Sequence, residues 1–300
     1  MNESPTCLVV MRDAVRRLDA ASVDDSRRNV EWMLCEVLGC ARAMFYAHPD
    51  RPVSPPEVHR LEAMIVRRIA HEPLQYILGH TEFFGLHLSV TPDVLIPRPE
   101  TEQVVEAALL RLGGRPSPRI LDVGTGSGCM ALALKHACPD ADVYACDVSA
   151  PALTVATGNA RHLALPIMFI GADALASDFG DRVPGALDLL VSNPPYVPFT
   201  EADSLAPEVL DHEPSLALFA GDDPLRFYRV LVHWGRVLLK PGGYVFFETH
   251  ADHARAVGGL LYEAGYAAVS VEDDLAGLPR IVSAQRTFSP TPFDSQPSLP

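Results

Sequence analysis

Apolar positions in the first part of the chain follow the spacing of a helix. Between residues 13 and 70 they recur at intervals of three and four residues, which places them on one helical face. Gly39 is typical of a helix end, and Ser54 followed by Pro55 is typical of a helix start. We predict a small helical domain over residues 1–75. The clearest run of apolar positions is Val30, Met33, Leu34, Val37 and Leu38.

The spacing changes to two residues shortly afterwards. Apolar residues 84, 86, 88 and 90 alternate with Gly85, His87 and Ser89, which is the period of a strand. We therefore predict a β-hairpin linker over residues 76–98.

From Arg119 onward, strand and helix patterns alternate in the order typical of parallel βαβ units. The fold class is α/β, with seven candidate strands in one doubly wound sheet over residues 99–286. Residues 287–300 carry four prolines and no periodic pattern, so we predict a disordered tail. The candidate strands are Ile120–Val123, Val143–Cys146, Ile167–Ile170, Leu187–Val191, Tyr244–Phe247, Ala267–Val269 and Arg280–Val282.

A glycine-rich turn joins the first of these strands to a helix. Such a turn lets backbone approach a ligand and points the amides of a helix N-terminus at it. A dinucleotide fingerprint would need glycine at position 129, where the chain has Cys129, so the spacing favours S-adenosylmethionine over a dinucleotide. An ordinary tight turn is the structural alternative. The candidate cofactor-binding residues in the turn are Gly124, Thr125, Gly126, Ser127 and Gly128.

Two aspartates follow the next two strands. Asp147 ends the second strand, where it can accept hydrogen bonds from ribose hydroxyls at the carboxyl edge of the sheet. Asp173 follows the third strand, and we expect it either to contact the adenine amino group or to cap a helix.

A proline-rich segment follows the fourth strand. The candidate catalytic residues are Asn193, Pro194, Pro195 and Tyr196. Two successive prolines forbid a helix and leave a stiff loop that presents acceptors. Such acceptors suit the nitrogen of an amide or an exocyclic amine, which is a poor nucleophile because its lone pair is delocalised into the π system. We hypothesise that the Asn193 side-chain oxygen and the Pro194 carbonyl accept its two N–H protons, while Tyr196 packs on the planar group. The structural alternative is a plain proline turn.

Charge and composition limit the kinds of molecule that the protein is expected to bind. The formal charge of −14 argues against a grip on free nucleic acid, which depends on clustered Lys and Arg. No apolar run reaches the length of a membrane span. The six cysteines include no C-x-x-C pair, and His250 and His253 lack partners at ligand spacing, so we expect reduced thiols and no metal. We expect a cytoplasmic monomer.

Several motifs together resemble the HemK-like protein glutamine N5-methyltransferases, which modify the Gly-Gly-Gln loop of peptide-chain release factors. The resemblance runs from the helical start to about Arg286. It is carried by Glu72–Gly79, Val94–Glu102, the glycine turn, Asn193–Tyr196, Glu208–Val209, His212–Pro214, Leu216–Leu218, Tyr228–Arg229 and Asp274–Gly277.

The resemblance implies a seven-stranded Rossmann-like class I methyltransferase sheet with a small N-terminal helical domain. It implies that S-adenosylmethionine contacts residues 124–128, Asp147 and Asn193, that residues 193–196 hold the glutamine amide, and that Arg98 and Thr101 border that site. It also implies that the helical domain grips a class I release factor.

The chain departs from the family pattern at a few places that concern the substrate-facing surface. His212 replaces a usual tyrosine, Pro224 a usual glycine, and Thr249-His250 a usual Ile-Gly. The alternative functions are glutamine methylation of a ribosomal protein, adenine N6 methylation of nucleic acid, since Asn-Pro-Pro-Tyr also occurs in adenine methyltransferases, and a binding module without turnover.

Overall fold

The computed structural model describes residues 4–287, which form a helical unit and an α/β unit. Of the described residues, 4–80 together with Ala206–His212 make up the helical unit. Its core buries apolar residues of the first, second and fourth helices, among them Leu18, Met33 and Leu61. Its helices are α1 (Cys7–Ala20), α2 (Ser26–Leu38), α3 (Ala43–Ala47), α4 (Pro55–Ile69), α5 (Leu74–Leu78) and α10 (Pro207–His212).

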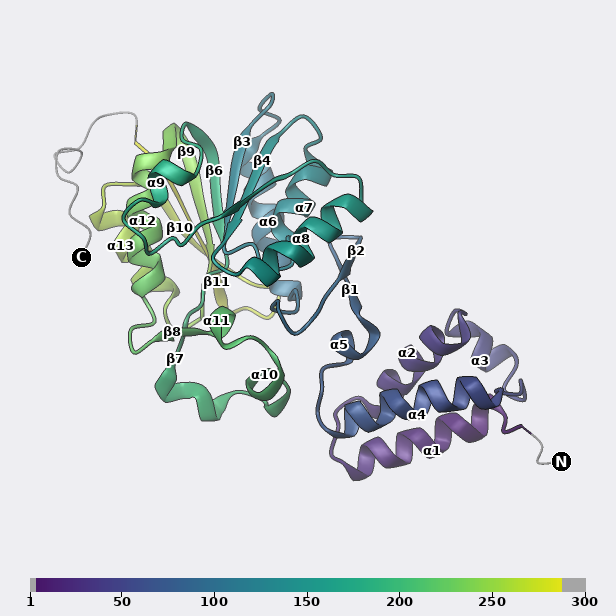
Figure 1. The fold of residues 1–300 in the computed structure, drawn as a ribbon. Helices are drawn as coiled ribbons and strands as arrows, with labels where there is room; N and C mark the ends of the chain where they lie inside the picture. The colour runs from purple at the N-terminus through teal and green to yellow at the C-terminus, as the bar shows by residue number, and fades with distance from the viewer. Residues whose placement is uncertain (1–3, 288–300) are drawn as a thin grey trace. The chain divides into compact units, whose positions relative to one another are not determined.

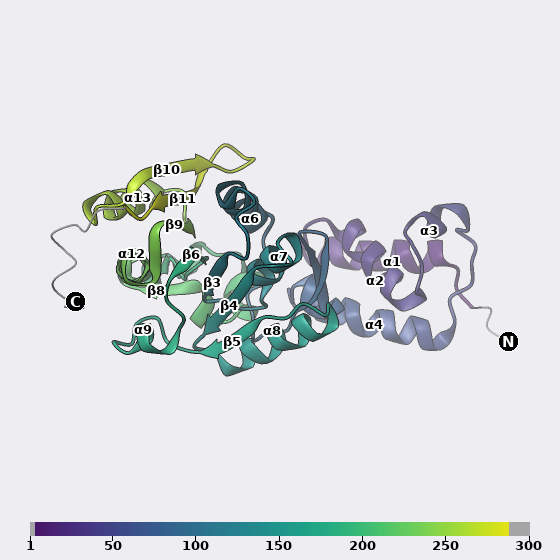
Figure 2. The ribbon, with the colours of Figure 1, turned by 90° about the horizontal axis from the view of Figure 1, so that it is seen from above.

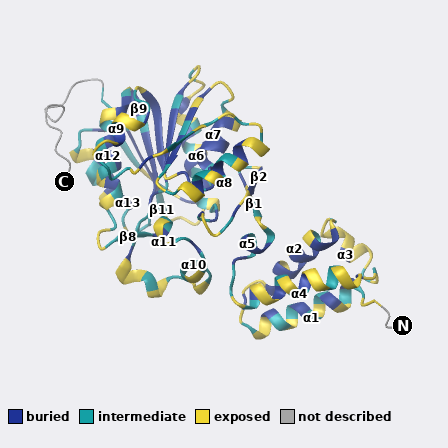
Figure 3. Cartoon of the chain, viewed as in Figure 1, coloured by how far each residue is buried: buried dark blue, intermediate teal, exposed yellow. Residues whose placement is uncertain are grey.

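The helix boundaries in this unit follow from local chemistry. The Ser54 backbone N–H donates to Glu57 Oε2 at 2.7 Å, and Pro55 occupies the first turn of α4. Gly39 ends α2 with a φ of +59°, a conformation that glycine adopts without strain. Figure 3 shows the buried stripes of α1, α2 and α4 that the three- and four-residue spacing predicts. These start and stop signals are confirmed.

The hairpin consists of β1 (His80–Phe83) and β2 (Leu86–Ser89), in which Leu86 and Leu88 are buried and their neighbours exposed. It begins later than predicted. Residues 76–78 lie in α5, because the backbone N–H groups of Tyr76 and Ile77 both donate to the Pro73 carbonyl and so form a helical turn.

Seven strands form one sheet in the α/β unit, in the order β10-β11-β9-β6-β3-β4-β5 (Figure 1). All seven candidate strands are confirmed. The pairs β3·β4, β4·β5, β3·β6 and β6·β9 are parallel. The strands are β3 (Arg119–Val123), β4 (Asp142–Asp147), β5 (Met168–Gly171), β6 (Leu187–Ser192), β9 (Leu239–Glu248), β10 (Ala267–Asp273) and β11 (Pro279–Gln285).

The expectation of parallel units throughout is wrong for the last strand. β11 runs antiparallel to both β9 and β10. The link between β10 and β11 spans residues 274–278. So short a link makes a hairpin, because a parallel crossover needs a dozen or more residues.

Helices cover both faces of the sheet (Figure 2). Neighbouring residues of β3 divide between the two cores: Ile120 packs with α6, α7 and α8, whereas Leu121 packs with α9, α12 and α13. The central strands β3 and β6 are therefore buried on both faces, as parallel strands usually are. The helices are α6 (Pro99–Leu112), α7 (Cys129–Ala137), α8 (Ala150–His162), α9 (Phe179–Arg182), α12 (Arg226–Leu238) and α13 (Ala254–Glu263).

The chain makes an excursion between β6 and α12. It runs through β7 (Val197–Pro198), a 3₁₀ helix (Phe199–Ser204), α10, α11 (Ser215–Leu218) and β8 (Phe219–Gly221). β7 pairs with β8, and the rings of Phe199 and Phe219 lie 5.3 Å apart, so the two ends of the excursion are joined.

Three further sequence expectations concern the C-terminal tail, membrane spans and the cysteines. The predicted tail lies, apart from Thr287, outside the described residues. Within residues 4–287 no helix is both long and apolar enough to span a membrane. All six cysteines are free.

Candidate active site

A cavity lies at the carboxyl ends of β3, β4 and β6. Because these strands are parallel, the segments that follow them meet at one edge of the sheet. The cavity brings together most of the residues that the sequence singled out. Its lining includes Arg98, Thr101, Gly124, Thr125, Gly126, Ser127, Asp147, Asp173, Asn193, Pro194 and Pro195.

The glycine turn follows β3 with its backbone exposed to the cavity. The N–H groups of Gly124 and Thr125 donate to the Cys146 carbonyl at 2.9 and 3.0 Å, which fixes the turn against β4. Gly126 has a φ of +55°, and a Cβ added there would meet no protein atom within 4 Å. Gly128 differs: it does not line the cavity, and an added Cβ would lie 3.2 Å from Ala156 Cβ. Gly128 therefore allows close packing on α8, while Gly126 leaves space for a ligand.

Asp122 supports the turn from below, a role that the sequence analysis missed. Its Oδ2 accepts from Thr125 Oγ1 at 2.7 Å and from the Ala131 N–H at 3.2 Å. The side chain is fully buried, and burial raises the pKa of its carboxyl to about 7 against the opposing hydrogen bond from Thr125. An acidic residue inside an apolar strand, two positions before the first glycine, was the available signal.

Asp147 and Asp173 both line the cavity but are held differently. Asp147 Oδ2 accepts from the Gly126 N–H and Oδ1 from the Ser149 N–H, each at 2.9 Å, and burial raises the pKa of the carboxyl. Each oxygen keeps a second lone pair for a ligand hydroxyl. Asp173 is exposed, and its Oδ1 accepts from the Leu175 N–H at 2.9 Å. It closes a turn rather than capping a helix, since α9 begins at Phe179.

The donor set of this half of the cavity fits a nucleoside with a polar extension. Ser127 is 2% exposed, and its hydroxyl has no hydrogen-bond partner among the described residues. A buried hydroxyl without a partner costs free energy that a polar ligand group would recover. Val148 and Leu231 add apolar wall suited to a planar base. Residues 124–127, Asp147 and Asp173 thus suit the predicted cofactor.

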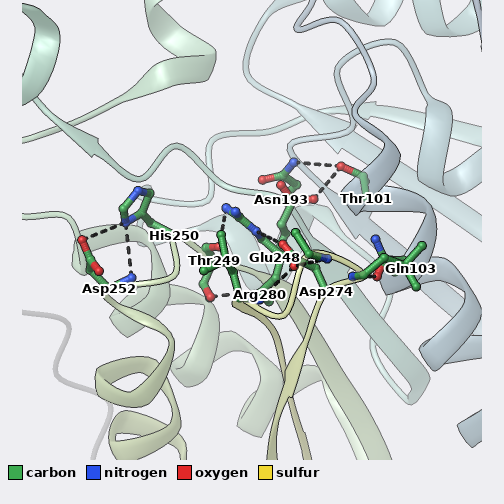
Figure 4. Close-up of polar contacts among 12 residues, drawn as sticks. Thr101, Gln103, Asn193, Glu248, Thr249, His250, Asp252, Asp274 and Arg280 are labelled. Atoms are coloured by element: carbon green, nitrogen blue, oxygen red, sulfur yellow. Dashed lines mark hydrogen bonds and ion pairs between the residues drawn. The ribbon is translucent and has the colours of Figure 1, made fainter. Parts of the chain in front are cut away.

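The segment after β6 forms the opposite wall. The Ser192 hydroxyl donates to the Val123 carbonyl at 2.7 Å, which ties this segment to the strand that carries the glycine turn. Asn193 Nδ2 lies 3.4 Å from Thr101 Oγ1, at the long end of a hydrogen bond, and Thr101 Oγ1 donates to Glu248 Oε2 at 2.5 Å (Figure 4). Asn193 is thus connected to residues of α6 and β9.

Glu248 is the second residue that the sequence analysis missed. It ends β9, is 2% exposed, and burial raises the pKa of its carboxyl to about 7, against the opposing effects of the Thr101 hydroxyl and the Arg280 charge. Arg280 is itself held by Asp274, at 3.2 Å (Figure 4). In the sequence Glu248 stood out only as the residue before the Thr249-His250 departure.

Tyr196 and Arg98 lie at the margin of the cavity. Tyr196 is absent from the cavity lining; its ring packs against the core and lies 6.1 Å from the His250 ring, and burial raises the pKa of its hydroxyl to about 12. Arg98 lines the cavity but forms an ion pair with Glu213, whose other oxygen accepts from the Ile96 N–H at 3.2 Å. The structure therefore brings Arg98, Thr101 and Asn193 together and leaves Tyr196 outside.

The lining also contains apolar residues that the sequence analysis did not assign to the site. Phe227 and Leu231 of α12, and Leu216 and Ala217 of α11, face the cavity. An apolar residue that faces a cavity has the same helical spacing as one that faces the core, so periodicity does not separate the two. Within residues 4–287 no group of three or more His, Cys, Asp or Glu residues is placed to hold a metal ion.

Comparison with known proteins matches two family models to the chain. The model of the PrmC N-terminal domain matches residues 10–79, and the model of the Methyltransferase small domain matches residues 106–213. Among solved structures, the 16S rRNA N2 G1207 methyltransferase of T. thermophilus, in complex with AdoMet and guanosine, has a TM-score of 0.50 at 18% identity, covering 69% of this chain and 49% of that one. This likeness shows the fold.

Two curated relatives are much closer in sequence. The release factor glutamine methyltransferase of Geobacter sulfurreducens is 40% identical over 264 residues, which cover 88% of this chain and 90% of that protein. The release factor glutamine methyltransferase of Chlorobaculum tepidum is 43% identical over 268 residues, covering 87% and 90%. The predicted class I methyltransferase fold is confirmed, and the chain belongs to the family of release factor glutamine methyltransferases.

Proposed function

We propose that this protein transfers the methyl group of S-adenosylmethionine to the side-chain amide nitrogen of a glutamine in a class I peptide-chain release factor. The observation that carries the proposal is that the turn at residues 124–127 and the Asn193–Pro195 segment line one cavity. This common lining supports a cofactor site and a site for a planar amide side by side. The names and extent of the close relatives support glutamine as the substrate.

In this proposal the glycine turn and two carboxylates hold the cofactor. Asp147 accepts hydrogen bonds from the ribose hydroxyls, Asp173 contacts the adenine amino group, and the Ser127 hydroxyl binds a polar group of the cofactor. Gly124, Thr125 and Gly126 let the backbone approach, while Gly128 seats the turn on α8. The bound cofactor supplies an activated methyl group on a sulfonium. Once the nitrogen carries the methyl group its proton is acidic and is released to water, and the cofactor would leave as S-adenosylhomocysteine, so that no residue of the chain has to serve as a strong base.

The Asn193 segment acts by position. Asn193 Oδ1 and the Pro194 carbonyl accept the two N–H protons of the glutamine amide, which localises the nitrogen lone pair and orients it toward the methyl group. Pro195 keeps the segment rigid, and Tyr196, whose ring packs against the core outside the cavity lining, anchors the end of the segment. Positioning of this kind accounts for large rate effects without covalent chemistry. Arg98 and Thr101 border the amide site.

The same proposal covers the domains, the oligomeric state and the location of the protein. The helical domain, residues 1–75, binds the release factor. The β-hairpin linker and the methyltransferase domain follow it in the chain, and the protein acts as a monomer in the cytoplasm. The formal charge of −14 supports a protein substrate over free nucleic acid.

The test is to incubate the protein with isotopically labelled S-adenosylmethionine and, separately, a purified release factor, ribosomal proteins or DNA. We expect mass spectrometry to locate the label on one glutamine of the release factor. Label on a ribosomal-protein glutamine would replace the substrate, and label on adenine would refute the proposal.

A further inference from the structure

The side chain of Asn193 must face one particular way to accept from a substrate amide. An amide has an oxygen acceptor at one end and an NH₂ donor at the other, and the two ends have nearly the same shape. If Oδ1 faces the cavity, Nδ2 must face the protein and find an acceptor there. In the structure Nδ2 faces Thr101 Oγ1 at 3.4 Å, and the Asn193 side chain also acts on the Glu248 carboxyl, whose pKa its hydrogen bond lowers against the effect of burial.

A threonine hydroxyl can donate or accept, so by itself Thr101 does not select one orientation of Asn193. Its single proton is already committed, because Oγ1 donates to Glu248 Oε2 at 2.5 Å. Only lone pairs of Oγ1 then remain for Asn193, and they accept from Nδ2 but repel Oδ1. The carboxylate thus decides which end of the Asn193 amide faces inward.

Burial makes this contact effective. Thr101 is 3% exposed and Glu248 2%, so water does not compete for either group. The end of β9 is held in place as well, since Tyr228 Oη donates to the Glu248 carbonyl at 2.8 Å. Figure 4 shows the three side chains converging from α6, the end of β6 and the end of β9.

We propose that Glu248 and Thr101 are positioning residues: Glu248 takes the hydroxyl proton of Thr101, Thr101 accepts from Asn193 Nδ2, and Asn193 Oδ1 is thereby directed at the substrate amide. This inference rests on the proposed function of Asn193. It assigns a role to a buried acid that transfers no proton to substrate and makes no contact with it.

The ionisation of Glu248 switches this hydrogen-bond chain. A protonated carboxyl can donate to Thr101 Oγ1, which frees the threonine proton for Asn193 Oδ1 and permits the reversed amide. Because burial raises the pKa of Glu248 to about 7, the switch falls near neutral pH, with the ionised, productive form above it. Two charged groups shift the pKa of Glu248: Arg280 of β11 lowers it and Glu100 of α6 raises it. The charge of Glu248 in turn raises the pKa of three neighbours, Tyr196, Tyr228 of α12 and Cys129 of α7.

The first test measures turnover with saturating cofactor and a purified release factor. Thr101→Val should lower kcat about 10- to 100-fold, the effect of one misdirected hydrogen bond, and leave the affinity for S-adenosylhomocysteine within about threefold. Thr101→Ser should restore most of kcat. Wild-type kcat should rise through a midpoint near pH 7, and Glu248→Gln should remove that midpoint. Thr101→Val with wild-type kcat would overturn the inference.

Matched variants separate positioning from loss of a buried polar contact. Tyr266→Phe removes another buried hydroxyl, which donates to the Val232 carbonyl at 2.9 Å and lies outside the cavity lining, and it should keep kcat within about twofold. Asp188→Asn neutralises a buried acid that accepts from Lys240 at 2.8 Å, and it should keep the pH midpoint. If either control reproduces the effect of its partner variant, the inference fails.

A second measurement does not depend on turnover. NMR signals of the Asn193 side-chain NH₂ should shift with a midpoint near pH 7 in the wild type, and they should lose this dependence in Glu248→Gln and Thr101→Val. If the protein methylates no glutamine but the signals titrate, the proposed function fails while the hydrogen-bond chain stands. If the signals do not titrate in an active enzyme, the inference itself is wrong.

Discussion

The two walls of the cavity are held together in opposite ways. The glycine turn is fixed mainly by neighbours in the chain: Thr125 bonds Asp122 three residues earlier, and Gly126 bonds Asp147 only 21 residues later. The Asn193 wall is fixed by distant residues. Asn193 and Thr101 are separated by 92 residues, and Thr101 and Glu248 by 147.

This difference shows which part of the site can be predicted from a short stretch of sequence and which part cannot. A turn whose contacts are local carries its geometry in a short motif, so the motif predicts the site. A side chain oriented by residues from two other elements acquires its geometry only on folding. We call the glycine turn the first wall, and Asn193 with Thr101 and Glu248 the second wall. We expect substitutions in the first wall to change cofactor affinity, and substitutions in the second wall to change kcat.

Asn193→Ala should give the largest separation between the two walls. It removes an acceptor of the substrate amide, so we expect kcat to fall about 10²- to 10³-fold, comparable to the loss of one preorganised hydrogen-bonding group in other active sites. Calorimetric titration with S-adenosylhomocysteine should give nearly unchanged affinity. Near-normal turnover of this variant would remove Asn193 from the proposed mechanism.

The second-largest expected effect concerns Asp122 and the pH dependence of the free energy of unfolding. Burial raises the pKa of Asp122 to about 7, from an ordinary value of about 3.9. Between these values the folded state holds a proton that the unfolded state has released, so the free energy of unfolding falls as pH rises from about 4 to 7 and then levels off. The expected loss is on the order of a few kcal/mol.

Asp122→Asn should remove that share of the slope, because the carboxamide does not titrate. Chemical denaturation at several pH values between 4 and 8 measures it. Glu248→Gln should act in the same direction, since its raised pKa lies in the same range. Should the free energy of unfolding of Asp122→Asn keep the wild-type slope, Asp122 ionises normally in the folded protein.

Several features were predictable from the sequence for a physical reason. Strands and amphipathic helices have fixed periods, and parallel strands bring their carboxyl ends to one edge. Hence the seven strands and the gathering of Gly126, Asp147 and Asn193 around one cavity could be expected. The direction of β11 could have been inferred too, from the short link after β10.

Other features depend on packing and were not predictable. Phe227 has the same helical spacing whether it faces a core or a cavity. The burial of Glu248 depends on how closely β9 approaches α6, which no local pattern encodes. Tyr196 belongs to the predicted motif, but its ring packs beside His250 rather than in the lining, because its direction depends on the neighbouring loop.

Gly126→Ala tests the glycine turn, and we expect a smaller effect than for the two preceding variants. The glycine has a φ of +55°, so alanine costs about 1 kcal/mol of strain, and the new methyl enters open space at a residue that lines the cavity. We expect about tenfold weaker S-adenosylhomocysteine binding by calorimetry. Gly259→Ala in α13 is the control: its added Cβ also meets no atom within 4 Å, but it lies in a helix, where alanine should stabilise by about 0.5–1 kcal/mol. Equal losses of affinity in both variants would show that the φ of Gly126 and its place in the cavity are irrelevant.

His250→Ala should give the smallest effect and tests whether the family departure at this position belongs to the second wall. The His250 ring lies 6.1 Å from the Tyr196 ring and is 40% exposed, so its loss should lower the free energy of unfolding by less than about 1 kcal/mol. If the His250 ring only covers Tyr196, kcat should change less than about threefold. Tyr196→Ala should lower the free energy of unfolding by more than His250→Ala does, because the Tyr196 ring packs against the core. Thermal unfolding and steady-state kinetics measure both. A tenfold loss of kcat in His250→Ala with unchanged stability would mean that the imidazole itself takes part in holding the substrate, and that the second wall extends beyond Asn193, Thr101 and Glu248.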